Sequence, residues 1–211
     1  MVFVDILLVV AAYLLGSIPS AVWIGKKYYG VDVREHGSRN AGATNTLRVL
    51  GRRAALPVFA LDVFKGFVAV TLAHLAGYPH GSDQTFNLKI ALVAAAVLGH
   101  IFPVFAGFRG GKGVATLAGA VLGVYPPAVL LCVATFLVVL MVSHYVSLSS
   151  MTAGVMFPVY IVLVFRETYL PLILFGCVIA VLLIFTHRKN IRRLAAGTES
   201  KIYLWKPRPR K

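Results

Sequence analysis

The chain alternates between long apolar segments and shorter polar ones. A helix needs about 20 mostly apolar residues to cross the hydrocarbon core of a bilayer. We predict seven spans, at 3–25, 54–78, 88–107, 113–126, 127–145, 151–165 and 168–186. The fourth is short for a complete crossing, and the two prolines at 126–127 favour a turn between it and the fifth. The pattern therefore predicts an all-α integral membrane protein, a bundle of seven transmembrane helices.

The composition agrees with a membrane location. Of the 211 residues, 59% are hydrophobic and 13% are charged, whereas an ordinary soluble domain is about 45–50% apolar and about 25% charged. The formal net charge is nevertheless +14, which favours anionic partners such as lipid headgroups or anionic substrates. Nucleic acid is a poor candidate, because the basic residues punctuate apolar segments and form no continuous stripe.

The basic residues are segregated between alternate polar segments. With seven spans, the loops 26–53, 107–113 and 144–150 and the tail 187–211 lie on one side and hold 18 of the 21 lysines and arginines. The other side holds Lys89 and Arg166, and Lys65 lies within a span. Positive residues gather on the cytoplasmic side, so we predict an N-terminus outside and a cytoplasmic C-terminus. The first segment lacks a basic n-region and a clear cleavage site, and we interpret it as a retained span.

The first basic loop is rich in groups that bind anions. Its glycines at 37 and 42 let the backbone approach a ligand closely. It also holds short hydrogen-bonding side chains and two positive charges, namely Ser38, Asn40, Thr44, Asn45, Arg39 and Arg48. A capped turn leading into a helix would use similar residues. The density of polar groups beside a membrane bundle favours anion binding.

The second basic loop is rich in glycine and reads Gly107-Phe-Arg-Gly-Gly-Lys-Gly-Val-Ala-Thr116. Backbone N–H groups of such a turn at the start of a helix can surround a phosphate, and Lys112 adds a positive charge. The spacing of a Walker A motif is absent. A tight turn between two helices, without a ligand, is the alternative interpretation.

Two further polar segments lie on the same predicted side. Ser147 and Ser150 can donate to a phosphate or cap the next helix. If the last span continues as a helix beyond the membrane, His187 and Asn190 share a face and can address one ligand. A basic helix at the lipid headgroups would explain the neighbouring basic residues, but not His187, Asn190 and Glu199.

Two opposite charges interrupt the second span. Asp62 and Lys65 lie three residues apart, and a charge near the bilayer centre costs roughly 2.5–3.5 kcal/mol on insertion scales. We expect them to face the protein interior and to form a structural pair. His100 ends an apolar span and is expected to be packed and hydrogen-bonded. Cys132 and Cys177 lie in apolar segments, and no residue cluster indicates a metal.

These polar segments, in this order, resemble those of the bacterial acyl-phosphate–glycerol-3-phosphate acyltransferases of the PlsY type. The matching stretches span nearly the whole chain and are GSIP at 16–19, GSRNAGATN at 37–45, DVFKG at 62–66, GHIFPVF at 99–105, FRGGKGVAT at 108–116, SL at 147–148 and NIRRL at 190–194, with Glu199 and Lys201. Each stretch is moderately specific, and the ordered set is highly specific. Arg39 departs from the pattern, because the family often has glycine there.

The resemblance implies an enzyme of the bacterial cytoplasmic (inner) membrane whose substrates are acyl phosphate and glycerol 3-phosphate. It would transfer the fatty acyl group to the 1-hydroxyl of sn-glycerol 3-phosphate, giving lysophosphatidic acid and phosphate for phospholipid biosynthesis. The family pattern implies catalytic roles for His187, Asn190, Lys112 and Ser38, and substrate binding by Arg48, Asn40, Thr44, Asn45, Gly110, Gly111, Ser147, Ser150, Glu199 and Lys201. No metal or cofactor is expected, coenzyme A included.

The candidate mechanism lacks an obvious general base. No histidine is followed five residues later by aspartate, so the His-x4-Asp pair of many glycerolipid acyltransferases is absent. Acyl phosphate is already an activated donor, and we expect positioning and electrostatic stabilisation to supply most of the catalysis. The donor's own phosphate would take the hydroxyl proton. His187 is the alternative base, because an unperturbed histidine titrates near neutrality.

A small-anion membrane transporter is the main alternative class. Transporters usually have repeated halves and polar groups near the midplane, whereas here no repeat is apparent and the polar groups lie toward one face. We expect a single membrane-embedded acyltransferase domain over 1–211, in contact with membrane lipid and without a nucleic-acid partner. The sequence indicates no oligomeric state. The enzyme interpretation requires the basic loops to gather close enough to share a ligand.

Overall fold

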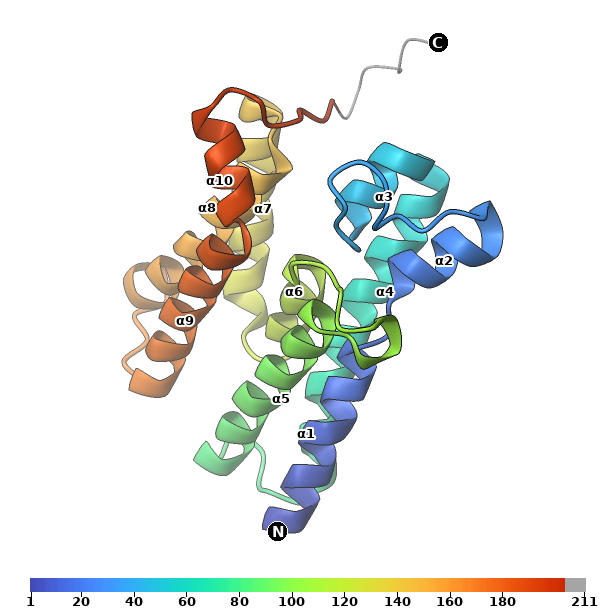
Figure 1. Cartoon of the computed structure of the whole chain (residues 1–211). Coiled ribbons are helices and arrows are strands. Elements are labelled where there is room, and N and C mark those ends of the chain that lie inside the picture. Colours follow the sequence, from blue (N-terminus) through green and yellow to red (C-terminus); the bar gives the residue numbers. More distant parts are fainter. Residues whose placement is uncertain (204–211) are drawn as a thin grey trace. The chain divides into compact units, whose positions relative to one another are not determined.

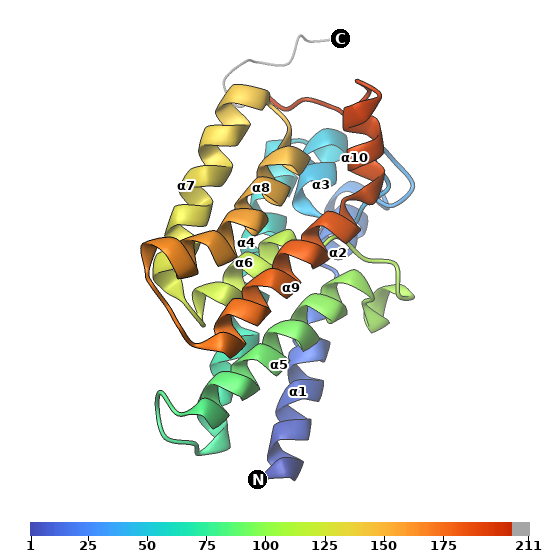
Figure 2. The same cartoon turned by 90° about the vertical axis from the view of Figure 1, so that its left-hand side faces the viewer.

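The computed structural model describes residues 1–203; the last part of the predicted basic tail, 204–211, lies outside the described residues. Every regular element within 1–203 is helical. The chain forms two compact units, an N-terminal unit, Met1–Pro126, and a C-terminal unit that begins at Pro127. Figures 1 and 2 show the helices of both units.

The N-terminal unit is a bundle of long helices with short ones at one end. The elements are α1 (Val2–Gly16), α2 (Ser20–Tyr29), α3 (Ala43–Leu50), α4 (Arg52–Thr71), the 3-10 helix η1 (Leu72–Ala76), α5 (Asp83–Ile101), the 3-10 helix η2 (Val104–Ala106) and α6 (Val114–Leu122). In this unit, α2, α3 and the loop between α5 and α6 lie toward the end opposite the N-terminus (Figure 1). Both predicted phosphate loops therefore lie at the same end.

Glycines allow the long helices of this unit to touch backbone to backbone. A Cβ on Gly16 of α1 would overlap a carbonyl group of α5, and a Cβ on Gly99 of α5 would overlap one of α1. Gly66 of α4 and Gly119 of α6 face each other's helix in the same way. Small residues give close packing where lipid, and not water, surrounds the helices. These two contacts hold α1 to α5 and α4 to α6.

The C-terminal unit consists of α7 (Pro126–Ser143), α8 (Val146–Val159), the π-helical turn η3 (Tyr160–Val164), α9 (Leu170–Thr186) and α10 (Arg188–Ala195). Gly154 of α8 and Gly176 of α9 bring these two helices together, because a Cβ at Gly154 would overlap the side chain of Leu183. The axes of α9 and α10 differ by 61°. The last span therefore continues past Thr186 only after a bend, and the condition of a continuous helix under which His187 and Asn190 would share a face is not met.

The described residues contain five helical segments long and apolar enough to cross a membrane, or six if the bent pair α9–α10 is one span. They are Val2–Tyr29, Arg52–Ala76, Asp83–Ala106, Pro126–Ser143 and Val146–Val164. The predicted span 113–126 contains only α6, whose 9 residues rise about 14 Å, well short of a hydrocarbon core of about 30 Å.

Two predicted boundaries differ from the structure for local reasons. The first segment is divided between α1 and α2 at residues 17–19, where Pro19 has no N–H to continue the helical ladder. The predicted loop 144–150 is mostly helix, because α8 begins at Val146. Two of its serines donate to carbonyls one turn earlier: Ser149 to that of Tyr145 and Ser150 to that of Val146, each at 2.8 Å.

Candidate active site

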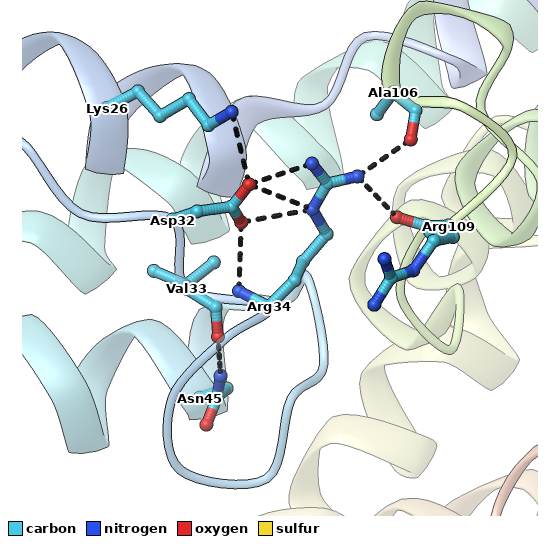
Figure 3. A network of polar contacts seen from close by, with 7 residues as sticks. All are labelled: Lys26, Asp32, Val33, Arg34, Asn45, Ala106 and Arg109. Carbon is cyan, nitrogen blue, oxygen red and sulfur yellow. Dashed lines mark hydrogen bonds and ion pairs between the residues drawn. The ribbon is translucent and has the colours of Figure 1, made fainter.

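An arginine joins the first basic loop to the glycine-rich loop (Figure 3). The Arg34 guanidinium donates to the carbonyl oxygens of Ala106, at 2.7 Å, and Arg109, at 3.4 Å. The same guanidinium donates two hydrogen bonds to the Asp32 carboxylate, with Nε 3.0 Å from Oδ1 and Nη2 2.8 Å from Oδ2. Lys26 approaches Asp32 at 3.2 Å. The two loops, more than 70 residues apart in sequence, are therefore fixed to one another.

The Asp32–Arg34 pair, bound to the carbonyls of Ala106 and Arg109, forms a clamp between the two loops. Its electrostatics favour the ionised forms of both side chains. The side-chain hydrogen bond from Arg34 outweighs the cost of partial burial, and the backbone N–H of Arg34 and the Lys26 ammonium add to it, so the pKa of Asp32 lies well below its ordinary value of 3.8. The same pairing raises the pKa of Arg34. The clamp is therefore fully charged throughout the neutral range.

Asn45 organises the first loop from within. Its Oδ1 accepts hydrogen bonds from the Ser38 backbone N–H at 2.8 Å and from the Ser38 hydroxyl at 3.0 Å. Its Nδ2 donates to the carbonyls of Val33 and His36, at 2.7 Å and 3.1 Å. The side chain is buried at the start of α3. Asn45 thus presents the Ser38 side of the loop in a fixed conformation, and its own polar atoms face the protein.

Arg39, where the family often has glycine, adopts a backbone conformation that suits glycine. Arg39 has a φ of +59°, in the left-handed region that glycine adopts without strain. Its N–H donates to the His36 carbonyl at 3.0 Å, and the side chain is exposed. Asn40, Thr44 and Arg48 follow in the same loop and along α3, each partly accessible.

The glycine-rich loop folds back over the end of α5. The N–H of Gly110 donates to the Ile101 carbonyl at 3.2 Å, and that of Gly111 to the His100 carbonyl at 3.1 Å. A Cβ on Gly110 would overlap the His100 carbonyl, and a Cβ on Gly111 would overlap Nε2 of the His100 ring. The loop leads to Lys112 and to the first turn of α6. Glycine is required here for close packing onto α5.

A buried polar cluster lies beneath this loop. The Asp62 carboxylate receives hydrogen bonds from Ser20 at 2.6 Å and Lys65 at 2.8 Å, and its Oδ1 lies 3.6 Å from Nδ1 of His100. The same Nδ1 lies 3.0 Å from the Thr116 hydroxyl. All five side chains are buried. The expected Asp62–Lys65 pair is present in this structure, and His100 is packed and hydrogen-bonded as predicted.

In the C-terminal unit, Glu199 gathers the predicted residues of the third loop and the tail. Its Oε1 accepts from Ser147 at 2.9 Å and from Asn190 at 2.7 Å, and its Oε2 accepts from Arg193 at 2.6 Å. Burial disfavours the carboxylate, but the hydrogen bonds from Arg193, Asn190 and Ser147 outweigh it and hold the pKa of Glu199 below its ordinary value of 4.5. The four side chains form one ionised, hydrogen-bonded group.

His187 lies at the bend between α9 and α10 and is buried. Its Nδ1 is 2.8 Å from the Leu183 carbonyl oxygen. A proton on Nδ1 would donate to that carbonyl, and in the neutral ring Nε2 would then be the acceptor. Lys201 extends over the ring of Tyr145, with Nζ 5.4 Å from its centroid.

Sequence reasoning missed the residues that fix the loops. Asp32 and Arg34 carry no motif, and the only signal was an acid two residues before an arginine in a basic loop. The grouping of Asp62 with His100 and Thr116 was also missed, because these residues come from three different helices. The structure brings the first loop to the second, and Ser147 to Asn190 and Glu199.

The family model and the relatives that match this chain all carry one description, glycerol-3-phosphate acyltransferase. The sequence matches the family model described as glycerol-3-phosphate acyltransferase over residues 6–197. A glycerol-3-phosphate acyltransferase from Chlorobaculum tepidum is 40% identical over 220 aligned residues, covering 92% of this chain and 95% of the relative. One from Fusobacterium nucleatum is 41% identical over 193 residues, with the same coverages.

Two crystal structures of PlsY, an integral membrane glycerol 3-phosphate acyltransferase, are similar to this fold. The glycerol 3-phosphate form has a TM-score of 0.83 and 39% identity, covering 94% of this chain and 96% of that one. The lysophosphatidic acid form has a TM-score of 0.80 and 38% identity, covering 94% and 95%. The chain therefore belongs to the glycerol-3-phosphate acyltransferase family, as an all-helical integral membrane enzyme.

Proposed function

We propose that the protein transfers a fatty acyl group from acyl phosphate to the 1-hydroxyl of sn-glycerol 3-phosphate. The hydroxyl oxygen bonds to the acyl carbonyl carbon, and the bond from that carbon to the phosphate oxygen breaks. The hydroxyl proton passes to an oxygen of the departing phosphate. The products are lysophosphatidic acid and inorganic phosphate, at an early step of phospholipid biosynthesis. Family membership supports this reaction, and both substrates carry the phosphate that basic loops can bind.

The observation in the chain that carries the proposal is the clamp between the two predicted phosphate loops. Arg34 and Asp32 fix the first loop to the carbonyls of Ala106 and Arg109. The loops so joined carry Arg48 and Lys112, whose charges suit a phosphate dianion. A pair of loops held in one geometry fulfils the requirement for positioning that an activated donor leaves to the enzyme.

Hydrogen-bond donors that already bond to the protein are not available to a phosphate, and this narrows the choice of phosphate ligands. The N–H groups of Gly110 and Gly111 donate to carbonyls of α5, so their contribution is to shape the loop. We assign phosphate binding to the Lys112 side chain and to the first N–H groups of α6, which a helix offers to anions. Ser38, Asn40, Thr44 and Arg48 supply the polar and charged groups of the other loop, with Asn45 holding it.

Residues of the C-terminal unit serve the same reaction, in a single acyltransferase domain over 1–211. Glu199 orients Ser147 and Asn190 through the hydrogen bonds described above. His187 and Asn190 act on the glycerol 3-phosphate side of the reaction, with His187 as the alternative acceptor of the hydroxyl proton. Ser150 and Lys201 complete the proposed substrate-binding set.

The proposed topology has seven membrane-embedded helices, an outer N-terminus and a cytoplasmic C-terminus, in the bacterial cytoplasmic membrane. In it the short α6 takes the fourth place, and the segregation of basic residues supports the orientation. The test uses a variant without Cys132 and Cys177 that carries a single cysteine, Ser82→Cys or Ser200→Cys. An impermeant maleimide should label the first in intact cells and the second only after permeabilisation. The reverse pattern would overturn the orientation.

The activity test uses purified protein in detergent with palmitoyl phosphate and labelled glycerol 3-phosphate, without coenzyme A. We expect labelled lysophosphatidate and phosphate in equal amounts. Palmitoyl-CoA in place of the acyl phosphate should give no product. Lys112→Met should reduce kcat/KM by about a hundredfold, because a phosphate contact and its positioning are lost together. Uptake of unmodified glycerol 3-phosphate into liposomes, without product, would instead support transport.

A further inference from the structure

The buried cluster under the glycine-rich loop is more elaborate than helix packing requires. A charged pair inside a membrane helix is costly, and an apolar pair of similar volume would pack at least as well. Here the pair makes additional contacts outside its own helix. Lys65 donates to the Ile18 carbonyl at 2.7 Å, and Ser20 donates to Asp62 at 2.6 Å. Both contacts lie at the break between α1 and α2, and α2 then leads into the first basic loop.

The same cluster reaches the second loop through His100. The ring is held by Thr116 and lies near Asp62, at 3.0 Å and 3.6 Å from Nδ1. Its opposite side faces Gly111 so closely that a Cβ at Gly111 would overlap Nε2. A small cavity, with room for about one water molecule, is lined by side chains of the cluster and by residues of both loops, among them Ser20, Asp62, Lys65, His100, Ala41 and Gly110.

We infer that Asp62 and His100 are positioning residues for the glycine-rich loop. Asp62, fixed by Lys65 and Ser20, sets the orientation of the His100 ring, and the ring supports the Gly110–Gly111 turn that precedes Lys112. This inference rests on the proposed function, in which that loop binds a substrate phosphate. Neither residue is assigned contact with substrate: His100 is 6% exposed and Asp62 1%, and the loop itself covers the ring.

The first test replaces the ring while keeping parts of its function. His100→Leu keeps bulk under Gly111 and removes the hydrogen bond to Thr116; His100→Asn keeps a polar atom near the position of Nδ1 and removes most of the ring. We expect both to raise KM for one or both phosphate substrates by about tenfold or more, since small displacements of a binding loop have large effects. A variant that is only less stable would lose Vmax through loss of folded protein and keep the wild-type KM.

The second test addresses Asp62. Asp62→Asn leaves Lys65 as an uncompensated buried charge and can fail to fold, so Asp62→Asn combined with Lys65→Met is the informative variant. We expect this double variant to fold and to show the raised KM. Thr85→Val is the matched control, because Thr85 is also buried on α5 but bonds to Pro79 and Ser82 at the far end of the helix. It should lower the melting temperature and leave KM unchanged.

A direct readout of the loop separates this inference from the proposed reaction. Hydrogen–deuterium exchange at the amides of Gly110 and Gly111 should accelerate at least about tenfold in His100→Leu and stay at the wild-type rate in Thr85→Val. If exchange accelerates but wild-type protein makes no lysophosphatidate, the proposed function fails and the positioning role stands. If His100→Leu and His100→Asn both keep the wild-type KM values and the wild-type exchange rates at 107–113, the inference is refuted.

Discussion

Removing the arginine of the clamp should disturb both loops at once. In Arg34→Met the loop carbonyls of Ala106 and Arg109 lose a charged donor, and Asp32 loses its principal partner. Charged hydrogen bonds contribute about 1.5–3 kcal/mol each, and removing one partner of a buried ion pair costs about 3–5 kcal/mol. Lys26 still approaches Asp32 at 3.2 Å and is 59% exposed, so part of that penalty is relieved. We therefore expect a loss of about 2–3 kcal/mol of stability.

The loss should also appear in substrate binding. KM for at least one phosphate substrate should rise about tenfold, and exchange of the amides in 107–113 should accelerate. Arg34→Lys keeps the positive charge but loses the planar guanidinium, so its KM and its exchange rates should lie between those of the wild type and those of Arg34→Met. Lys27→Met removes an exposed positive charge on the neighbouring helix and should leave KM and stability unchanged. If Arg34→Met keeps wild-type KM, melting temperature and loop exchange, the clamp does not organise the site.

A double-mutant cycle measures how far Asp32 and Arg34 stabilise the protein through their contact with each other. Asp32→Asn and Arg34→Met, alone and combined, should give a coupling energy of about 1–3 kcal/mol, because they act in one network. Additive losses would show that Asp32 and Arg34 stabilise the protein independently.

Four further predictions follow from the site. Glu199→Gln should destabilise the C-terminal unit by about 1–3 kcal/mol, because buried donors lose their ionised acceptor; thermal unfolding and kcat/KM test this, and unchanged values contradict it. The pKa of Glu199 is lowered from 4.5, so its contribution is complete above that pH and is lost as the pH falls below it; proteolysis of the 196–203 segment should increase between pH 6 and pH 3.5 in the wild type but not in Glu199→Gln. Arg39→Gly should stabilise the protein by up to about 1 kcal/mol through relief of its left-handed backbone; a lower melting temperature would contradict this, and a raised KM would show that the side chain binds substrate. His187→Ala should keep most of its turnover number if the donor phosphate accepts the proton; a loss of kcat of about a thousandfold would identify the histidine as the base.

The sequence predicts the helical membrane fold because hydrophobic runs report burial in lipid directly. It predicts the Asp62–Lys65 pair for the same reason, since two charges in one apolar run must compensate each other. It also singles out Ser38 and Lys112 as candidate phosphate ligands in glycine-containing polar loops, which stays a prediction. What it does not predict is which partner a polar group selects across the chain. Arg34 bonds to backbone carbonyls, and a carbonyl has no residue type by which a pattern could reveal it.

Helix interruptions were harder to predict than helices. Proline at position 19 ends a helical ladder, but hydropathy continues through it, so the pattern predicts one long span where the chain forms α1 and α2. The bend at His187 has no proline or glycine in the adjoining turn. It accompanies the hydrogen bond between the His187 ring and the Leu183 carbonyl, a local contact at the end of α9 that the pattern of residue types does not predict.

The distribution of polar contacts explains how an acyltransferase can work without a dedicated His–Asp dyad exposed to substrate. Several polar side chains form their hydrogen bonds with other groups of the protein, namely Asn45, Glu199 and the Asp32–Arg34 pair. In the proposed mechanism such groups do not move protons; they fix the geometry of the loops that carry the proposed phosphate ligands. An acyl phosphate already has a good leaving group, so the barrier that remains is mainly one of approach and charge, which fixed cationic loops lower. The chemistry of the donor and the rigidity of the loops therefore account for the same feature: many residues that hold the backbone in place, and few that are suited to acid–base catalysis.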